Sequence, residues 1–148
     1  MMRSLIALAL LALAGCGWPE SANTENPGTG TAALPPGQLE EFQLPSGNIG
    51  CAYIPEGGTS VYRSPDGRAE LQCDRVAPTY VRFVLSETGP AALQENLGEA
   101  PCCAGEILAH GQSWSRGPFT CQSAEAGLTC TNGDGHGFML SRESAQAR

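Results

Sequence analysis

The sequence predicts an all-β fold, either a small disulfide-stapled sandwich or a barrel of short antiparallel strands. Short runs rich in β-branched and aromatic residues recur along the chain, and turns containing Gly, Pro, Asn and Asp separate them. Six cysteines follow Cys16, and an even number of cysteines in a small exported domain favours disulfide bonds. Aromatic residues are few, so covalent cross-links are expected to supply part of the stability.

Residues 1–15 have the pattern of a lipoprotein signal peptide. Arg3 precedes an unbroken apolar run over residues 5–14, which is too short to cross a bilayer as a helix. The run ends in the tetrapeptide LAGC, which matches the bacterial lipoprotein cleavage site, so Cys16 is expected to carry the lipid. Several acyl chains on one cysteine would give stable membrane anchoring.

The chain after the signal peptide divides into a tether and a domain. Residues 16–37 are rich in Gly, Pro, Thr and Asn and lack any helical or alternating pattern, which is typical of a flexible linker. Residues 38–148 are expected to form a single β-rich domain with a short C-terminal tail.

The charge of the chain restricts its partners. The whole sequence has a net charge of −7 and contains no lysine, and removal of residues 1–15 takes away one arginine and no acid. An acidic chain with scattered arginines offers no basic stripe for nucleic acid. It is also repelled by anionic headgroups, so the lipid on Cys16 would have to supply the membrane contact. A cationic protein partner would fit this charge.

Several segments are expected to be strands, and one segment is ambiguous. Residues 79–86, TYVRFVLS, carry the strongest strand signal because β-branched and aromatic residues run through them. Residues 91–97 fit either a helix of about two turns or a strand returning from a hairpin. Residues 119–142 indicate a disulfide-tied hairpin that leads into a third strand. The other expected strands cover residues 39–44, 49–54, 60–63 and 69–76, with a short apolar piece at 106–109.

Two disulfide pairs are expected from the positions of the cysteines. Cys121 and Cys130 flank a polar turn on two strands expected to face each other, so they should pair. Cys51 and Cys73 lie on neighbouring expected strands and are the next pair.

Cys102 and Cys103 are then left with each other, as a strained bridge or as free thiols. Across a trans peptide their Cα atoms would lie about 3.8 Å apart, whereas bridged cysteines prefer more than about 4.4 Å. Such a pair should react first with a mild reductant, and it would suit a redox switch or, as free thiols with His110, a soft metal. The sequence lacks a second cysteine pair with metal-ligand spacing, so a structural bridge is favoured and no cofactor is expected.

The glycine-rich loop NGDGHG superficially fits a calcium site. Its first position holds Asn132 where a carboxylate is preferred, and His136 is a poor ligand for a hard cation. The segments on both sides of the loop are expected to be strands, whereas this type of site needs helices. No metal site is therefore expected.

Asp134, His136 and Ser141 have the residue types of a nucleophilic triad and form a candidate functional loop. Ser141 does not occupy a glycine-flanked elbow of the kind that exposes a nucleophile. We therefore expect no catalytic residue here, and a structural His136 held by a backbone carbonyl. A small hydrolase using His136 is the alternative.

Three motifs carry a resemblance to a known family. They are PSGNIGC, then LQCD, then LAHGQSW-x-x-GPFTCQS-x-x-x-GLTCTN-x-x-GHGF-x-LSR. Together they resemble a family of small exported bacterial proteins without an assigned activity, over residues 42–142. The resemblance implies a secreted or lipid-anchored, disulfide-bonded domain and no catalytic residue. The family spaces its middle cysteines apart, so adjacent Cys102 and Cys103 depart from its pattern and leave the third bridge open.

These observations predict a lipid-anchored protein of the bacterial cell envelope that acts as a non-enzymatic binding or interaction module. Gly17 after the lipidated cysteine favours the outer membrane, facing the periplasm, if the cell has one. One alternative is an inhibitor-type domain that captures a cationic envelope enzyme such as lysozyme. The other is the small envelope hydrolase using His136.

Overall fold

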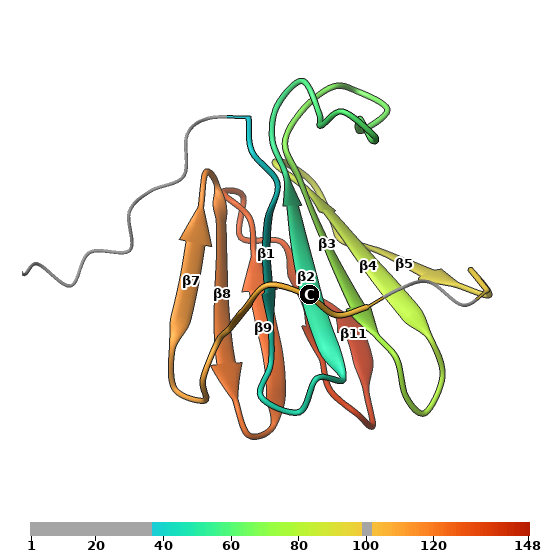
Figure 1. Ribbon diagram of the computed structural model, residues 1–148. Helices are drawn as coiled ribbons and strands as arrows, with labels where there is room; N and C mark the ends of the chain where they lie inside the picture. Colours follow the sequence, from blue (N-terminus) through green and yellow to red (C-terminus); the bar gives the residue numbers. More distant parts are fainter. Residues whose placement is uncertain (1–36, 99–101) are drawn as a thin grey trace, which may run out of the picture. The chain divides into compact units, whose positions relative to one another are not determined.

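The computed structural model describes residues 37–98 and 102–148, which form two β-sheets stacked face to face (Figure 1). No helix is present among these residues, so the all-β prediction is confirmed in the form of a sandwich. The same residues hold no helix long and apolar enough to cross a membrane.

The first sheet has six strands in the order β5-β4-β3-β2-β1-β6. All neighbouring strands are antiparallel except β1 and β6, which run parallel. Its strands are β1 (Glu40–Gln43), β2 (Ile49–Ile54), β3 (Glu70–Arg75), β4 (Val81–Ser86), β5 (Ala92–Glu95) and β6 (Glu106–Ile107).

The second sheet has five strands in the order β11-β10-β9-β8-β7, all antiparallel. Consecutive strands pair throughout, as short hairpin connections require. Its strands are β7 (Ser113–Arg116), β8 (Phe119–Ala124), β9 (Gly127–Thr131), β10 (Gly137–Leu140) and β11 (Ala145–Ala147).

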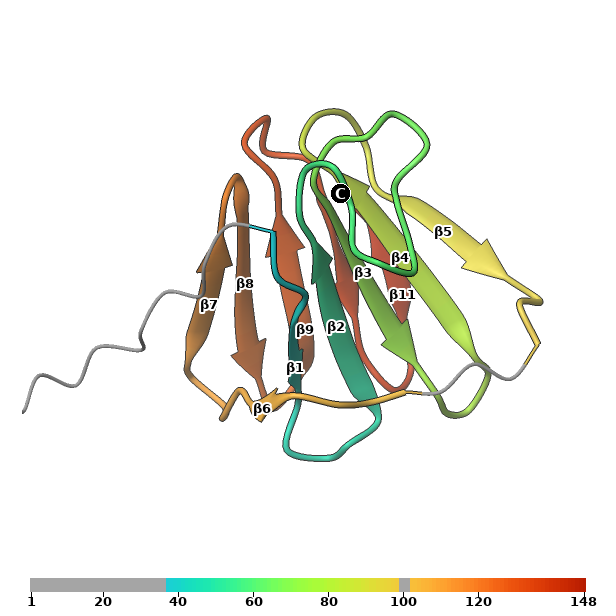
Figure 2. The ribbon, with the colours of Figure 1, turned by 45° about the horizontal axis from the view of Figure 1, so that its top comes forward.

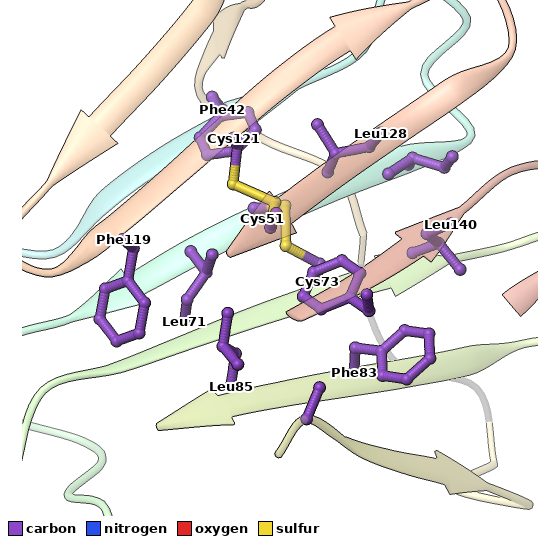
Figure 3. Packing of buried hydrophobic residues seen from close by; sticks show 14 of the residues in the cluster. Phe42, Cys51, Leu71, Cys73, Phe83, Leu85, Phe119, Cys121, Leu128 and Leu140 are labelled. Carbon is purple, nitrogen blue, oxygen red and sulfur yellow. A yellow bond between two sulfur atoms is a disulfide. The ribbon is translucent and has the colours of Figure 1, made fainter. Parts of the chain in front are cut away.

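The core lies between the two sheets and is built by alternate residues of their central strands. In β4, Val81, Phe83 and Leu85 are buried, while the residues between them are partly exposed, which is the period-2 pattern of a half-buried strand. Phe83 stacks on Phe138 of the opposite sheet, with ring centroids 4.6 Å apart. Figure 3 shows how these apolar side chains interdigitate between the layers.

Each sheet carries one disulfide in this core. Cys51 and Cys73 are directly opposite residues of β2 and β3, and Cys121 and Cys130 are directly opposite residues of β8 and β9. These are the two pairs expected from the sequence. The Sγ atoms of Cys51, Cys73 and Cys130 lie within 4.8 Å of one another, so the two bridges pack together across the layers (Figure 3).

Polar side chains also join the two sheets. The buried Arg75 of β3 donates from Nη1 to the carbonyl oxygen of Ser141, at 3.1 Å. Asn132, after β9, donates from Nδ2 to the carbonyl oxygens of Ser86 and Gly89, at 3.0 and 2.9 Å. Buried polar groups are costly unless they are hydrogen-bonded, so both side chains fix the alignment of the layers.

Two expected elements are wrong. Residues 60–63 form no strand because the Thr59 hydroxyl accepts hydrogen bonds from the backbone N–H groups of Val61 and Tyr62 and closes a turn. The helical alternative for residues 91–97 is also wrong. Gly89 adopts a positive φ of 79° and turns the chain back, so β5 pairs antiparallel with β4.

Two strands were not expected. The connection at residues 110–118 contains β7, and the C-terminal tail contains β11, which pairs with β10. Backbone hydrogen bonds in both directions between Gly137 and Arg148 hold the chain end against β10.

Candidate functional site

The outer face of the six-stranded sheet has a trough along β2. Gly50 and Ala52 alternate with the core-facing residues of β2 and therefore lie on its outer face. Both residues are small, so little side chain covers the strand there. Glu41 of β1 lies opposite Ala52 on one side, and Gln72 of β3 lies opposite it on the other. The trough therefore has a backbone floor and polar walls.

A crossing segment covers one end of the trough. The chain leaves β5 at one edge of the sheet and must reach β6 at the other edge, and the inner face is already covered by the second sheet. Residues 102–105 accordingly run over the outer face and lead to β6 beside β1 (Figure 2).

Two glycines allow this segment to lie directly on the sheet. A Cβ atom added at Gly50 would stand 2.8 Å from Sγ of Cys103, closer than real Cβ contacts. A Cβ atom added at Gly105 would collide with the backbone of Glu41. The Cys103 side chain therefore lies directly on the backbone of β2, and the backbone at Gly105 lies directly on the backbone of β1.

A cavity of about 410 Å³ remains between the segment and the sheet. Its volume falls within the range of small-molecule sites, about 300 to 1,000 Å³. The floor is Gly50 and Ala52, and the roof is formed by residues 102–104. The walls are the side chains of Glu41, Gln72, Asp74 and Arg82.

Asp74 and Arg82 form a forked ion pair in one wall. Arg82 Nε lies 2.6 Å from Asp74 Oδ1, and Nη2 lies 2.8 Å from Oδ2. The hydrogen bonds to Asp74 raise the pKa of Arg82, so its charge is fixed. Arg82 Nη2 also donates to the Tyr80 hydroxyl at 3.3 Å, and burial together with Asp74 raises the pKa of Tyr80 to about 12. The phenol therefore stays neutral.

Glu70 orients the Gln72 side chain. Gln72 Nε2 donates to Glu70 Oε1 at 2.6 Å, and the Tyr62 hydroxyl donates to the same oxygen at 3.0 Å. Burial and this hydrogen bond to Glu70 raise the pKa of Tyr62. The Gln72 amide nitrogen is thus turned toward Glu70, which leaves its carbonyl oxygen available to a ligand.

Cys102 and Cys103 form a disulfide in the roof of the cavity, and both residues are half-buried. The expectation of a trans peptide between them is wrong, because this peptide is cis. In the bridged form neither sulfur is a thiolate, which is the form that binds metals. The same holds for the four core cysteines, although three of their sulfur atoms are clustered.

Asp134, His136 and Ser141 are not brought together. His136 precedes β10 and Ser141 follows it, so a strand of four residues separates them. The Ser141 hydroxyl is buried and accepts from the backbone N–H groups of Glu143 and Ser144, at 3.2 and 3.0 Å. The triad arrangement therefore does not form.

The loop before β10 is organised by Asn132 instead. Its Oδ1 accepts from the backbone N–H groups of Asp134 and His136, at 3.2 and 3.0 Å. Asp134 Oδ2 accepts from the Gly89 N–H at 3.0 Å. The expected hydrogen bond from His136 to a backbone carbonyl is absent within residues 37–98 and 102–148, where the exposed imidazole has no partner.

Of the cavity residues, the sequence singled out the cysteines, among them Cys102 and Cys103 of the roof, and it did not indicate the walls or the floor. The alternation of polar residues with core residues in β3 was a usable signal for Gln72 and Asp74, but nothing local indicates that residues 102–104 lie over Gly50. The proposed lipidation site, Cys16, lies outside the described residues. No protein-family model, no curated protein and no solved structure matches the chain.

Proposed function

We propose that the protein is a lipid-anchored binding module of the bacterial cell envelope and that the cavity beneath residues 102–104 is its binding site. The observation that carries this proposal is the cavity itself, a hollow of about 410 Å³ with small residues in its floor and polar side chains in its walls. Pockets of this size with a few placed polar groups are the usual form of ligand sites.

A binding role is favoured over catalysis by the groups that line the cavity. Among the described residues that line it, none is a histidine, a serine or a free thiol, and the one cation, Arg82, is paired with Asp74. Nucleophilic catalysis requires an activated nucleophile beside a base, and the described lining residues include carboxylates that could act as a base but no hydroxyl or free thiol beside them.

A second candidate function is the capture of a cationic envelope enzyme such as lysozyme. The net charge of −7 and the lack of lysine support it, because charge complementarity speeds association with a cationic partner. Capture of this kind should weaken sharply at high salt, whereas binding of a neutral ligand in the cavity should change little.

The test compares three forms of the full mature protein on a solid support. Ala52→Trp places an indole on the cavity floor, and Gln122→Trp places the same group on the exposed outer face of β8. Envelope components retained by the wild type and by Gln122→Trp, but lost with Ala52→Trp, would support the proposal. Equal retention by all three forms would contradict it.

A further inference from the structure

We propose that the cavity binds the ammonium or guanidinium group of an organic cation, held over Ala52 between Glu41 and Gln72. This inference rests on the proposed function and specifies the ligand of the same site. The two sources of such a group are a free amine, such as a diamine, and a lysine or arginine side chain of a protein.

The spacing of the strands defines the slot. Glu41, Ala52 and Gln72 occupy one row across β1, β2 and β3. Neighbouring strands lie about 4.8 Å apart, so the backbones that carry Glu41 and Gln72 are separated by roughly 10 Å. Only the methyl group of Ala52 stands between them, which leaves room for one charged head group.

The charge of the lining selects a cation. Asp74 and Arg82 neutralise each other through two hydrogen bonds. Glu41 is exposed, and its carboxylate has no hydrogen bond or ion pair with any residue in the described part of the chain. The described residues of the lining therefore carry one uncompensated negative charge, in a protein whose overall charge is also negative.

The hydrogen-bonding groups select a donor. The Glu41 carboxylate can only accept, and the Gln72 carbonyl oxygen is the free end of an amide whose nitrogen already donates to Glu70. Arg82 directs Nε and Nη2 at Asp74 and Tyr80. An ammonium group has three donors and no acceptor, so it matches the Glu41 and Gln72 oxygens.

The roof adds an apolar surface. The disulfide of Cys102 and Cys103 and the methyl group of Ala104 line the cavity above the floor. An aliphatic chain that carries the charged group can pack against them, as lysine stems do on apolar surfaces. The site therefore fits an alkylammonium or alkylguanidinium better than an inorganic cation.

The experiment titrates the ¹⁵N-labelled mature protein in non-ionic micelles with three probes. They are putrescine, N-acetyl-lysine-methylamide and the neutral N-acetyl-norleucine-methylamide. We expect the cationic probes to shift the amide signals of Gly50 and Ala52, and the neutral probe to leave them unchanged. Binding of putrescine would indicate a free amine as the ligand class, and binding of the lysine amide alone would indicate a protein side chain.

Glu41→Gln removes the uncompensated charge and keeps the shape of the side chain. It should weaken binding of the cationic probes about twofold to fivefold, as expected for an exposed ion pair. Glu125→Gln is the matched control because Glu125 is exposed in the turn between β8 and β9 and lies away from the cavity.

Two results would overturn the inference. One is equal binding of the neutral and cationic probes, and the other is an equal effect of Glu41→Gln and Glu125→Gln. If Ala52→Trp abolishes capture of an envelope component while no cationic probe binds, the binding module stands and the cation is wrong. If Ala52→Trp changes no capture, the proposed function itself fails.

Discussion

Gly50 has no side chain, and the Cys103 side chain occupies the space beside it. A methyl group added at Gly50 would therefore displace the crossing segment. We expect Gly50→Ala to lower the free energy of unfolding by about 1 to 3 kcal/mol, the usual cost of overpacking a fitted contact. The variant should also lose binding in the cavity because its roof is displaced. Chemical denaturation and the probe titration measure the two effects.

Gly133→Ala is the control for this substitution. A Cβ atom at Gly133 would meet Pro118 at 3.6 Å, an ordinary van der Waals contact. Its stability should stay within about 0.5 kcal/mol of the wild type. A stable Gly50→Ala variant with unchanged binding would show that the segment does not rest on the sheet.

Asn132 and His136 belong to one loop but should respond very differently to truncation. Asn132→Ala removes two donated and two accepted hydrogen bonds of a buried side chain, and we expect a loss of about 2 to 4 kcal/mol. His136→Ala removes an exposed side chain and should cost less than about 0.5 kcal/mol. Thermal or urea unfolding measures the stability of the two variants. A larger loss of stability for His136→Ala than for Asn132→Ala would contradict this prediction.

At the scale of the elements, the three disulfides differ in accessibility. Cys73, Cys121 and Cys130 are fully buried and Cys51 is 5 % exposed, whereas Cys102 and Cys103 are half-buried at the surface. A mild phosphine reductant should therefore reach the pair in the crossing segment first. Alkylation of the freed thiols followed by peptide mass spectrometry should find label on Cys102 and Cys103 while the circular dichroism of the sheets is unchanged. Earlier labelling of Cys121 or Cys130 would refute this order.

Strands that bury apolar residues were predicted from the sequence, whereas the exposed β5 was left ambiguous between helix and strand and β7 was missed. β4 alternates between buried and partly exposed positions and β2 is buried at five of its six positions, and their expected ranges, 79–86 and 49–54, match the structure closely. β5 is exposed at all four positions, and β7 buries none of its residues completely, so neither has an apolar period to detect. These edge strands depend on pairing with a neighbour, which only the assembled sheet provides.

The cavity could not be predicted from the sequence for a related reason. Its walls come from β1, β3 and β4, its floor comes from β2 and its roof comes from a segment that follows β5. Small residues such as Gly50 and Ala52 carry no chemical signal of their own. They acquire a role only when the topology places Glu41 and Gln72 on either side of them.

At the scale of the whole molecule, the attachment to the membrane stays a prediction from the sequence. If Cys16 is lipidated, the mature protein should partition into detergent, and Cys16→Ser should release it or block its processing. The intact mass of the purified mature chain measures this directly. A mature protein with an unmodified Cys16 would contradict the anchor, although the cavity and its ligand would be unaffected.

Two disulfides join neighbouring strands within a sheet, the third joins adjacent residues of the crossing segment, and none of the three joins one sheet to the other. This has a mechanical consequence if the chain is held ahead of β1 while a partner pulls on the domain. The force would first detach β1 from the sheet. Detachment would stop at Cys51, because the disulfide to Cys73 transmits the force to β3. Glu41 and Gly50 lie in the released part, so the cavity would open while the two bridges still hold the central strands. A ligand bound in the cavity as proposed would then be released under force before the domain unfolds.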